Sequence, residues 1–115
     1  MFLDVGQWQI PVESSREHKE IVLKLLDHHR ANPDEFPYKE AYFYKMPSED
    51  ASVESWMYIH IFDSTEAFLK MEDAQQRMLE TEPELKAAMD RAFELMVSDS
   101  WRTTQWTRVQ ESRNE

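Results

Sequence analysis

The chain has 115 residues, a net charge of −10 at pH 7, 41% hydrophobic and 31% charged residues, and no cysteine. This balance is typical of one packed globular domain, and the lack of cysteine excludes disulfides, thiolate metal sites and cysteine nucleophiles. The acidity, without any cluster of Lys and Arg, argues against nucleic-acid and membrane-surface partners. No apolar run is long enough for a signal peptide or a membrane span, so the expected location is the cytoplasm.

The first predicted strand runs from Leu3 to Val12, where apolar residues alternate with polar neighbours at the period of a half-buried strand. A helix is expected to follow. The capping-box pattern of Ser14 and Glu17 marks its start, and apolar residues at helical spacing continue it to about Ala31.

Two further strands are expected from Tyr38 to Met46 and from Glu54 to Phe62, joined as a hairpin by the acidic loop from Pro47 to Ser52. The second of these strands has aliphatic residues at its odd positions and aromatic or amphipathic residues at its even positions. Both of its faces are therefore expected to meet something other than bare solvent.

The second half of the chain predicts a broken helix. Asp63 or Ser64 caps its start. Pro83 then breaks and restarts the helix behind a second capping-box pattern, Thr81 with Glu84, because proline is tolerated only in the first turn.

A last strand from Trp101 to Val109 completes the order strand, helix, strand, strand, helix, strand. This order is that of the ferredoxin-like split βαβ fold, an α+β class with a four-stranded antiparallel sheet and its helices on one face. The domain is expected to cover residues 1–109, and the polar residues 110–115 are expected to form a disordered tail.

The segment Ser55 to Phe68, which leads from a strand into a capped Ser-Thr-Glu-Ala-Phe turn, and the proline-broken second helix resemble the dimeric α/β-barrel superfamily. That group includes antibiotic-biosynthesis monooxygenase-like domains. The resemblance implies that two chains pack their helix-free sheet faces together and leave a barrel or cleft between them. A homodimer is also expected because a lone chain would expose a large aromatic sheet face.

The predicted site lies on this helix-free face. If Met57, Ile59 and Ile61 face the helices, the even positions of the same strand, among them His60, face the cleft. His60 is then the expected catalytic acid or base, since its charge changes near neutral pH. The expected substrate-binding walls are Gln7, Gln9, Glu40, Tyr42, Tyr44, Trp56 and Tyr58.

The favoured function is a small-molecule-binding homodimer, in its most specific form a cofactor-independent monooxygenase or isomerase acting on an aromatic or polyketide-like compound. The alternative is a non-catalytic dimerisation or ligand-sensing domain, in which His60 and its neighbours only fill the dimer interface.

No metal or cofactor is expected. The single glycine excludes a glycine-rich phosphate loop. His28 and His29 are adjacent on a helix and point about 100° apart, which does not suit one metal ion. Haem-degrading members of the superfamily hold haem through a histidine on a helix near the sheet, and the second predicted helix has none.

Overall fold

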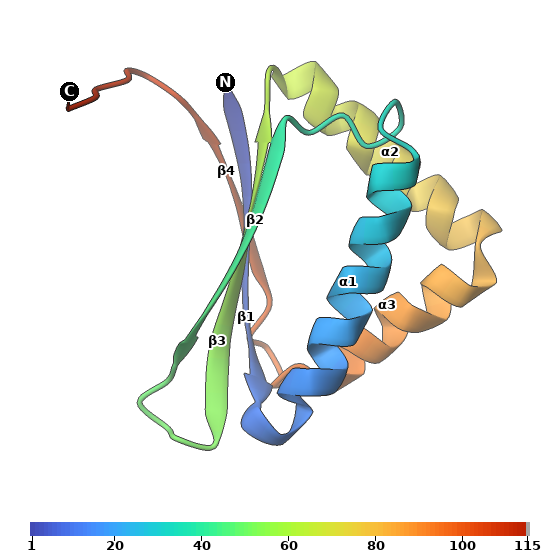
Figure 1. The fold of residues 1–115 in the computed structure, drawn as a ribbon, viewed down its shortest axis with the longest axis vertical. Helices are drawn as coiled ribbons and strands as arrows, with labels where there is room; N and C mark the ends of the chain where they lie inside the picture. Colours follow the sequence, from blue (N-terminus) through green and yellow to red (C-terminus); the bar gives the residue numbers. More distant parts are fainter. Residues whose placement is uncertain (115) are drawn as a thin grey trace.

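A computed structural model describes residues 1–114. Its strands are β1 (Phe2–Pro11), β2 (Glu40–Pro47), β3 (Val53–Phe62) and β4 (Arg102–Thr107), and its helices are α1 (Ser15–Ala31), α2 (Thr65–Thr81) and α3 (Pro83–Leu95), with a short 3₁₀ turn η1 (Val12–Ser14). The strands form one antiparallel sheet in the order β2-β3-β1-β4. The helices cover one face of this sheet, and the other face is bare (Figure 1). The predicted ferredoxin-like α+β fold is confirmed.

Only one of the predicted helix caps forms. Ser64 accepts a hydrogen bond from the backbone N–H of Ala67 at 3.2 Å, so α2 is capped as predicted. Ser14 makes no cap, because its backbone is already helical within η1 whereas an N-cap residue needs an extended backbone. The hydroxyl of Thr81 donates instead to the backbone carbonyl of Arg77. The capping boxes predicted at Ser14 and Thr81 are therefore wrong.

The strands β1 and β2 present the faces that their alternation predicts. In β1 the even-numbered residues are buried under the helices, and Gln7 and Gln9 lie on the opposite face, called the open face below. In β2, Ala41 and Phe43 face the helices. The open-face residues of β2 are Glu40, Tyr42, Tyr44 and Met46.

The strand β3 is turned the other way from the prediction. Asp4 pairs with His60 across the sheet, so the even-numbered residues of β3 lie under the helices beside those of β1. The cause is the register of the β2–β3 hairpin, which aligns the inward Phe43 with Tyr58. The residues wrongly expected on the open face are Trp56, Tyr58, His60 and Phe62, and those that take their place are Met57, Ile59 and Ile61.

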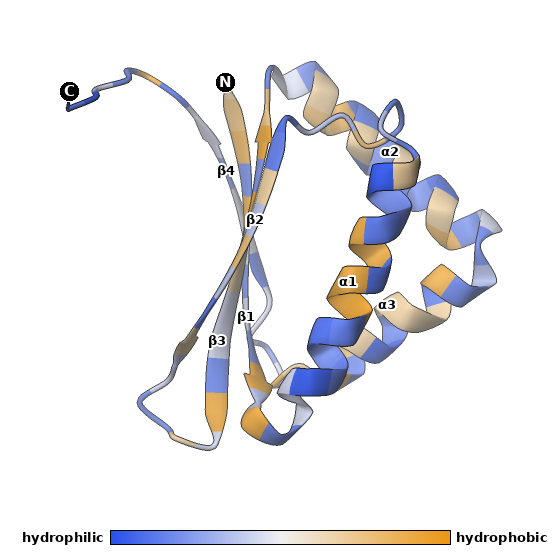
Figure 2. Ribbon diagram, viewed as in Figure 1, coloured by the Kyte–Doolittle hydropathy of each residue, from blue (hydrophilic) through white to orange (hydrophobic). Residues whose placement is uncertain are grey.

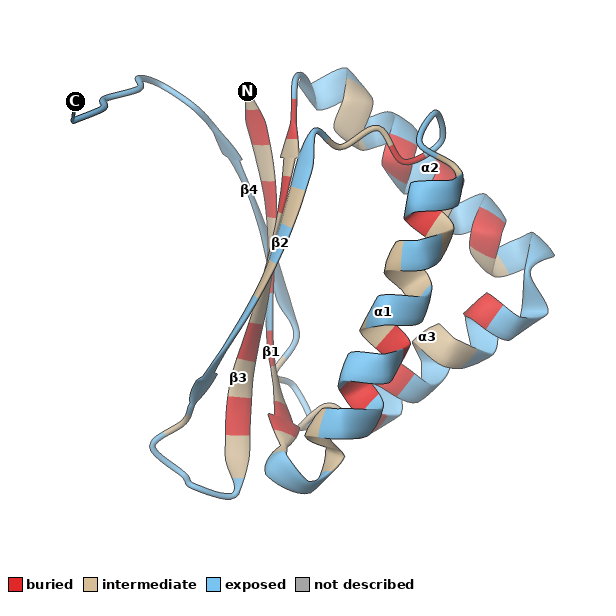
Figure 3. Cartoon of the chain, in the orientation of Figure 1, coloured by how far each residue is buried: buried red, intermediate tan, exposed pale blue. Residues whose placement is uncertain are grey.

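The core lies between the sheet and the helices, where buried residues line the inner side of each element (Figure 3). The same inner sides carry most of the apolar residues of the helices (Figure 2). Phe62 is fully buried and packs with Met71 and Met78 of α2, whereas Ile21 packs with Leu95 across α1 and α3. No helix within residues 1–114 has the length and apolar character needed to cross a membrane.

The chain beyond β4 carries no helix or strand from residue 108 to residue 114. The predicted disordered tail covers residues 110–115, of which Glu115 lies outside the described part of the chain.

Candidate functional site

The structure divides the predicted site between the two faces of the sheet. His60, Trp56 and Tyr58 lie on the helix-covered face. The other predicted substrate-binding residues lie on the open face, namely Gln7, Gln9, Glu40, Tyr42 and Tyr44. Because the sheet separates the two groups, His60 and Tyr58 share no pocket with the open-face residues, and of these helix-side residues only Trp56 also borders the groove that Gln7, Gln9 and Tyr44 line.

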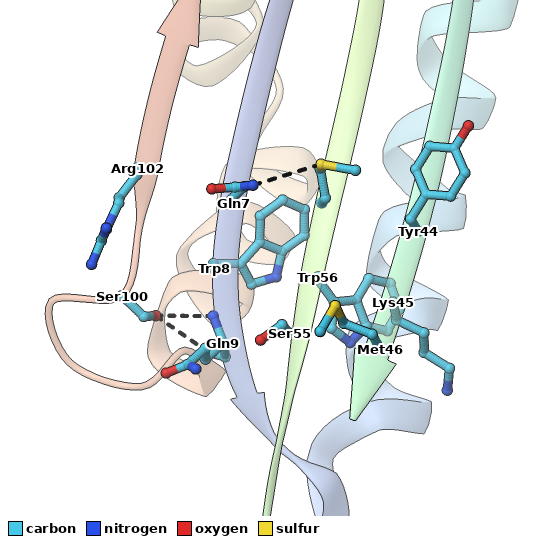
Figure 4. A pocket seen from close by; sticks show the side chains of 11 residues that line it. Gln7, Trp8, Gln9, Tyr44, Lys45, Met46, Ser55, Trp56, Ser100 and Arg102 are labelled. Carbon is cyan, nitrogen blue, oxygen red and sulfur yellow. Dashed lines mark hydrogen bonds between the residues drawn. The ribbon is translucent and has the colours of Figure 1, made fainter. Parts of the chain in front are cut away.

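A groove of about 470 Å³ on the open face gathers Gln7, Gln9 and Tyr44 (Figure 4). The amide of Gln9 donates to Ser48 Oγ at 3.2 Å, and the amide of Gln7 reaches the sulfur of Met57 at 3.7 Å. Neither a histidine nor a carboxylate lines this groove. It therefore offers no ordinary acid or base for proton transfer near neutral pH.

A second cavity, of about 280 Å³, lies between the sheet and the helices, and its wall is mainly aliphatic and aromatic. The polar side chains that reach it come from five elements. They are Asp4 of β1, Tyr58 and His60 of β3, His18 and His29 of α1, and Glu72 and Gln75 of α2, with Thr103 and Gln105 of β4 at the sheet edge. An apolar cavity with a few converging polar groups is typical of a small-molecule site.

Asp4 is held as an anion within this cavity. Its carboxylate accepts hydrogen bonds from the Tyr58 hydroxyl at 2.9 Å and from the Gln105 amide at 2.8 Å. Burial raises the pKa of Asp4, but the interactions with His60, Gln105 and Tyr58 lower it more, and the net pKa lies below the ordinary value. Asp4 therefore presents a negative charge 3.9 Å from Nδ1 of His60.

Tyr58 is held in its protonated form and reaches Asp4 through a gap left by Gly6. Burial, followed by the charge of Asp4 and the hydrogen bond to it, raises the pKa of the Tyr58 phenol far above the ordinary value. Gly6 pairs directly with Tyr58 across the sheet, and a Cβ at Gly6 would overlap the Tyr58 ring carbons. The absence of a side chain at Gly6 is therefore what lets the ring lie flat over β1.

Four buried side chains in this cavity have polar atoms without a hydrogen-bond partner in the described chain. They are both ring nitrogens of His60, both ring nitrogens of His29, Nδ1 of His18 and Oε1 of Gln75. The ring centroids of His29 and His60 are 6.3 Å apart. Buried polar groups in proteins are nearly always hydrogen-bonded, so this cluster of unpaired atoms is unusual.

His29 is neutral at pH 7. Its ring stacks on Phe36 with a centroid distance of 4.3 Å. Burial, with smaller contributions from the neighbouring His60 and His28, lowers the pKa of His29 to about 4. A neutral imidazole has one donor and one acceptor nitrogen, so His29 can bind a hydroxyl or a keto group without carrying charge.

His18 is engaged in the core. Its Nε2 accepts a hydrogen bond from the indole N–H of Trp8 at 2.9 Å, which requires Nε2 to be unprotonated. Within residues 1–114, no group of three or more His, Cys, Asp or Glu side chains is placed to hold a metal ion.

Sequence analysis missed Asp4, Gln75 and Gln105, and considered His29 only as a metal ligand. A signal for Asp4 was present, since its parity in the strand is opposite to that of Gln7 and Gln9, which were expected on the helix-free face. A carboxylate at such an inward position is almost never buried unless it is paired.

Comparison with known proteins supports the fold. No family model matches the chain, and no curated protein matches it. Among solved structures, a dimeric ferredoxin-like protein from an uncultured marine organism has a TM-score of 0.67 and 13% identity over 99% of this chain and 92% of that one. A Deinococcus radiodurans protein described as a candidate antibiotic biosynthesis monooxygenase has a TM-score of 0.62 and 12% identity, covering 100% of this chain and 99% of that one.

The chain shares the ferredoxin-like fold of these two proteins. An uncharacterised NIPSNAP domain protein from Burkholderia xenovorans shares this fold, with a TM-score of 0.58 and 11% identity over 99% of this chain and 100% of that one. At these identities the likeness to these solved structures extends to the fold, and function must be argued from the site.

Proposed function

We propose that each chain binds a small, largely apolar molecule with a hydroxyl or keto group in the cavity between sheet and helices, and that His60 removes a proton from it. The observation that carries this proposal is the convergence of unpaired, buried polar atoms of His60, His29 and Gln75 on one apolar cavity. A ligand oxygen between them would satisfy atoms that the protein leaves without partners.

His60 has the surroundings of a general base. Its ring nitrogens are not used by the protein, so one of them is available to accept a proton from the ligand. The imidazolium formed would be stabilised by the carboxylate of Asp4, 3.9 Å from Nδ1. Tyr58 and Gln105 hold that carboxylate in place through their hydrogen bonds. Asp4 is therefore a positioning residue in this scheme.

The proton abstraction is common to the two reactions expected from the sequence. An aromatic or polyketide-like compound that loses a proton becomes a phenolate or an enolate. Reprotonation of an enolate at another carbon makes the protein an isomerase. Attack of the electron-rich carbon on dioxygen, with return of the proton, gives a hydroperoxide. Cleavage of its O–O bond with loss of water leaves a new carbonyl group, so that one oxygen atom enters the product, the other leaves as water and the substrate supplies the electrons, which makes the protein a cofactor-independent monooxygenase. The fold that the chain shares with the Deinococcus protein supports the second reaction by analogy alone.

The proposal is tested with 2-tetralone, a bicyclic aromatic ketone with acidic C–H groups. Binding is followed by quenching of tryptophan fluorescence, and proton abstraction by the rate at which NMR detects deuterium uptake from D₂O. The His60→Gln variant should exchange at least about 100-fold more slowly than the wild type, which is the low end of general-base contributions. Tyr42→Phe, on the open face, is the matched control and should exchange at the wild-type rate.

Two outcomes contradict the catalytic part of this proposal. If the His60→Gln variant exchanges as fast as the wild type, His60 is not the base. If the wild type binds 2-tetralone in this cavity without accelerating exchange, the protein is better described as a non-catalytic ligand-sensing domain.

We also propose that the protein is a homodimer formed through the open face. Large apolar side chains on this face remain exposed in the single chain, with fractions of 49% for Tyr44, 63% for Met46 and 58% for Trp106. A solvent-exposed apolar surface of this extent is unusual for a monomer. Sedimentation velocity over a range of concentrations measures the assembly, and a monomer at every concentration contradicts the proposal.

A further inference from the structure

The open face is an almost square array of side chains. Tyr44, Met57, Gln7 and Arg102 form one row across the four strands, and Glu40, Ile61, Leu3 and Trp106 form another. The rows are four residues apart, which is about 13 Å along a strand, and each row spans three strand spacings, which is about 14 Å. The corners of this array are Glu40, Trp106, Arg102 and Tyr44.

The two charged residues of this array occupy opposite corners. Within the four described strands, Glu40 and Arg102 are the only charged residues on the open face. Neither takes part in an ion pair within the described chain, although Glu40 accepts a hydrogen bond from Tyr42 at 2.9 Å. Arg108, just beyond β4, is paired with Glu111 at 3.3 Å. Glu40 and Arg102 are roughly 19 Å apart, so they do not pair within one chain.

Twofold packing of two such faces allows a small number of arrangements, because sheets pack either nearly aligned or nearly orthogonal. In the aligned arrangements, Glu40 falls opposite the partner's Trp106 or the partner's Tyr44. In one orthogonal arrangement, Glu40 falls opposite the partner's Glu40, and Arg102 opposite the partner's Arg102. All of these arrangements bury charges without counter-ions or with like charges, which is strongly unfavourable.

The remaining orthogonal arrangement has its twofold axis along the diagonal from Tyr44 to Trp106. It places Glu40 of each chain opposite Arg102 of the other, and it brings the two Trp106 rings together and the two Tyr44 rings together. The corners of the two arrays coincide in this orthogonal packing because the array is nearly as wide as it is long. We propose that the homodimer has this crossed arrangement and is held in register by two symmetric Glu40–Arg102 ion pairs between chains. This inference rests on the proposed homodimer and names its geometry.

Charge exchange tests the pairing. Glu40→Arg and Arg102→Glu each place like charges at both symmetric contacts, and each should raise the dimer dissociation constant by at least about 100-fold. The double variant, Glu40→Arg with Arg102→Glu, restores opposite charges and should return to within about tenfold of the wild type. Far-UV circular dichroism confirms that each variant is folded. Thr104→Lys, which adds a charge between the corners, is the control. It should also weaken the dimer, but a second charge change should not restore the dissociation constant.

Cross-linking gives an independent readout, because the chain has no cysteine and only introduced thiols react. With a short bismaleimide, the Glu40→Cys/Arg102→Cys variant and the Trp106→Cys variant should form covalent dimers. Glu40→Cys alone should not, and its cross-linking would indicate the like-charge orthogonal arrangement.

The outcomes separate this inference from the homodimer itself. A wild-type protein that is monomeric at every concentration overturns both. A wild-type dimer whose two single variants are weakened but not restored by the double variant overturns the crossed arrangement and leaves the homodimer standing.

Discussion

Replacing His29 by phenylalanine should stabilise the protein at pH 7 and reduce its sensitivity to acid. His29 is 8% exposed and both of its ring nitrogens lack a protein partner. An unsatisfied buried polar group typically costs about 1–3 kcal/mol, so removing these nitrogens should increase the free energy of unfolding by about that amount. A phenyl ring can keep the stacking on Phe36. His29→Leu covers the case in which the phenyl ring is too large for the site.

The pH dependence gives a second, larger signal. The pKa of His29 falls from 6.5 to about 4 on folding. In the unfolded chain His29 therefore binds a proton as the pH falls below 6.5, whereas in the folded chain it does so only at about pH 4. The neutral ring is fully tolerated above pH 6.5, and stability is lost as the pH falls from there to about 4. The loss should reach about 3 kcal/mol, at about 1.4 kcal/mol per unit of pKa.

Urea unfolding at pH 7 and pH 4.5, at one fixed chain concentration and followed by tryptophan fluorescence, measures both effects. Burial, partly offset by the charge of Glu54, also lowers the pKa of His18, so a smaller slope should remain in the variant. His28→Leu, at the partly exposed neighbouring position, is the control and should keep most of the wild-type pH dependence, because burial is a larger cause of the lowered pKa of His29 than the charge of His28. If the free energy of unfolding falls by the same amount between pH 7 and pH 4.5 in His29→Phe and in the wild type, the reasoning is refuted.

Two further substitutions test the fold. Ser64→Ala should lower the free energy of unfolding by about 1 kcal/mol, because it removes the side-chain N-cap of α2, whereas Thr81→Ala should change it by less. Urea unfolding of both variants decides this, and equal effects would contradict it. Gly6→Ala should destabilise the protein by about 1–3 kcal/mol, because the new methyl group overlaps the Tyr58 ring. Combining it with Tyr58→Ala should remove most of that additional penalty, and near-UV circular dichroism should report the displaced ring.

The order of the elements and the faces of β1 and β2 could be predicted because each has one clearly polar side. The strand β3 offered no such contrast. Its odd positions are aliphatic and its even positions are aromatic or amphipathic, so alternation alone does not indicate which side faces the helices. The more apolar side was expected inward, but it lies on the open face.

The missing information was in the hairpin loop. The carboxylate of Asp50 accepts a hydrogen bond from the backbone N–H of Ser52 at 2.9 Å, which closes a local Asx turn. Val53 and Ser48 then pair across the loop, and this register carries Phe43 to Tyr58. Interpreting Asp50 and Ser52 as a turn, and counting outward from it, would have placed Tyr58 inward with Phe43.

The partners of His60 could not be predicted from periodicity. His29 and Gln75 come from α1 and α2, and their approach to His60 depends on how those helices cross the sheet. Sequence patterns give the buried stripe of each helix, but they do not give which residues of two stripes meet across a cavity.

The corner that connects α2 and α3 is a place where the size of the cavity can change without any change in the pairing of the strands. Thr81, Glu82 and Pro83 are exposed at this corner, where the helical layer turns back on itself well away from the strands (Figure 1). Both helices that it joins contribute cavity walls, with Gln75 on one side and Phe93 on the other. Lengthening or shortening the chain at this corner would therefore change the angle of the two helices, and with it the size of the cavity, while every strand pairing stays intact.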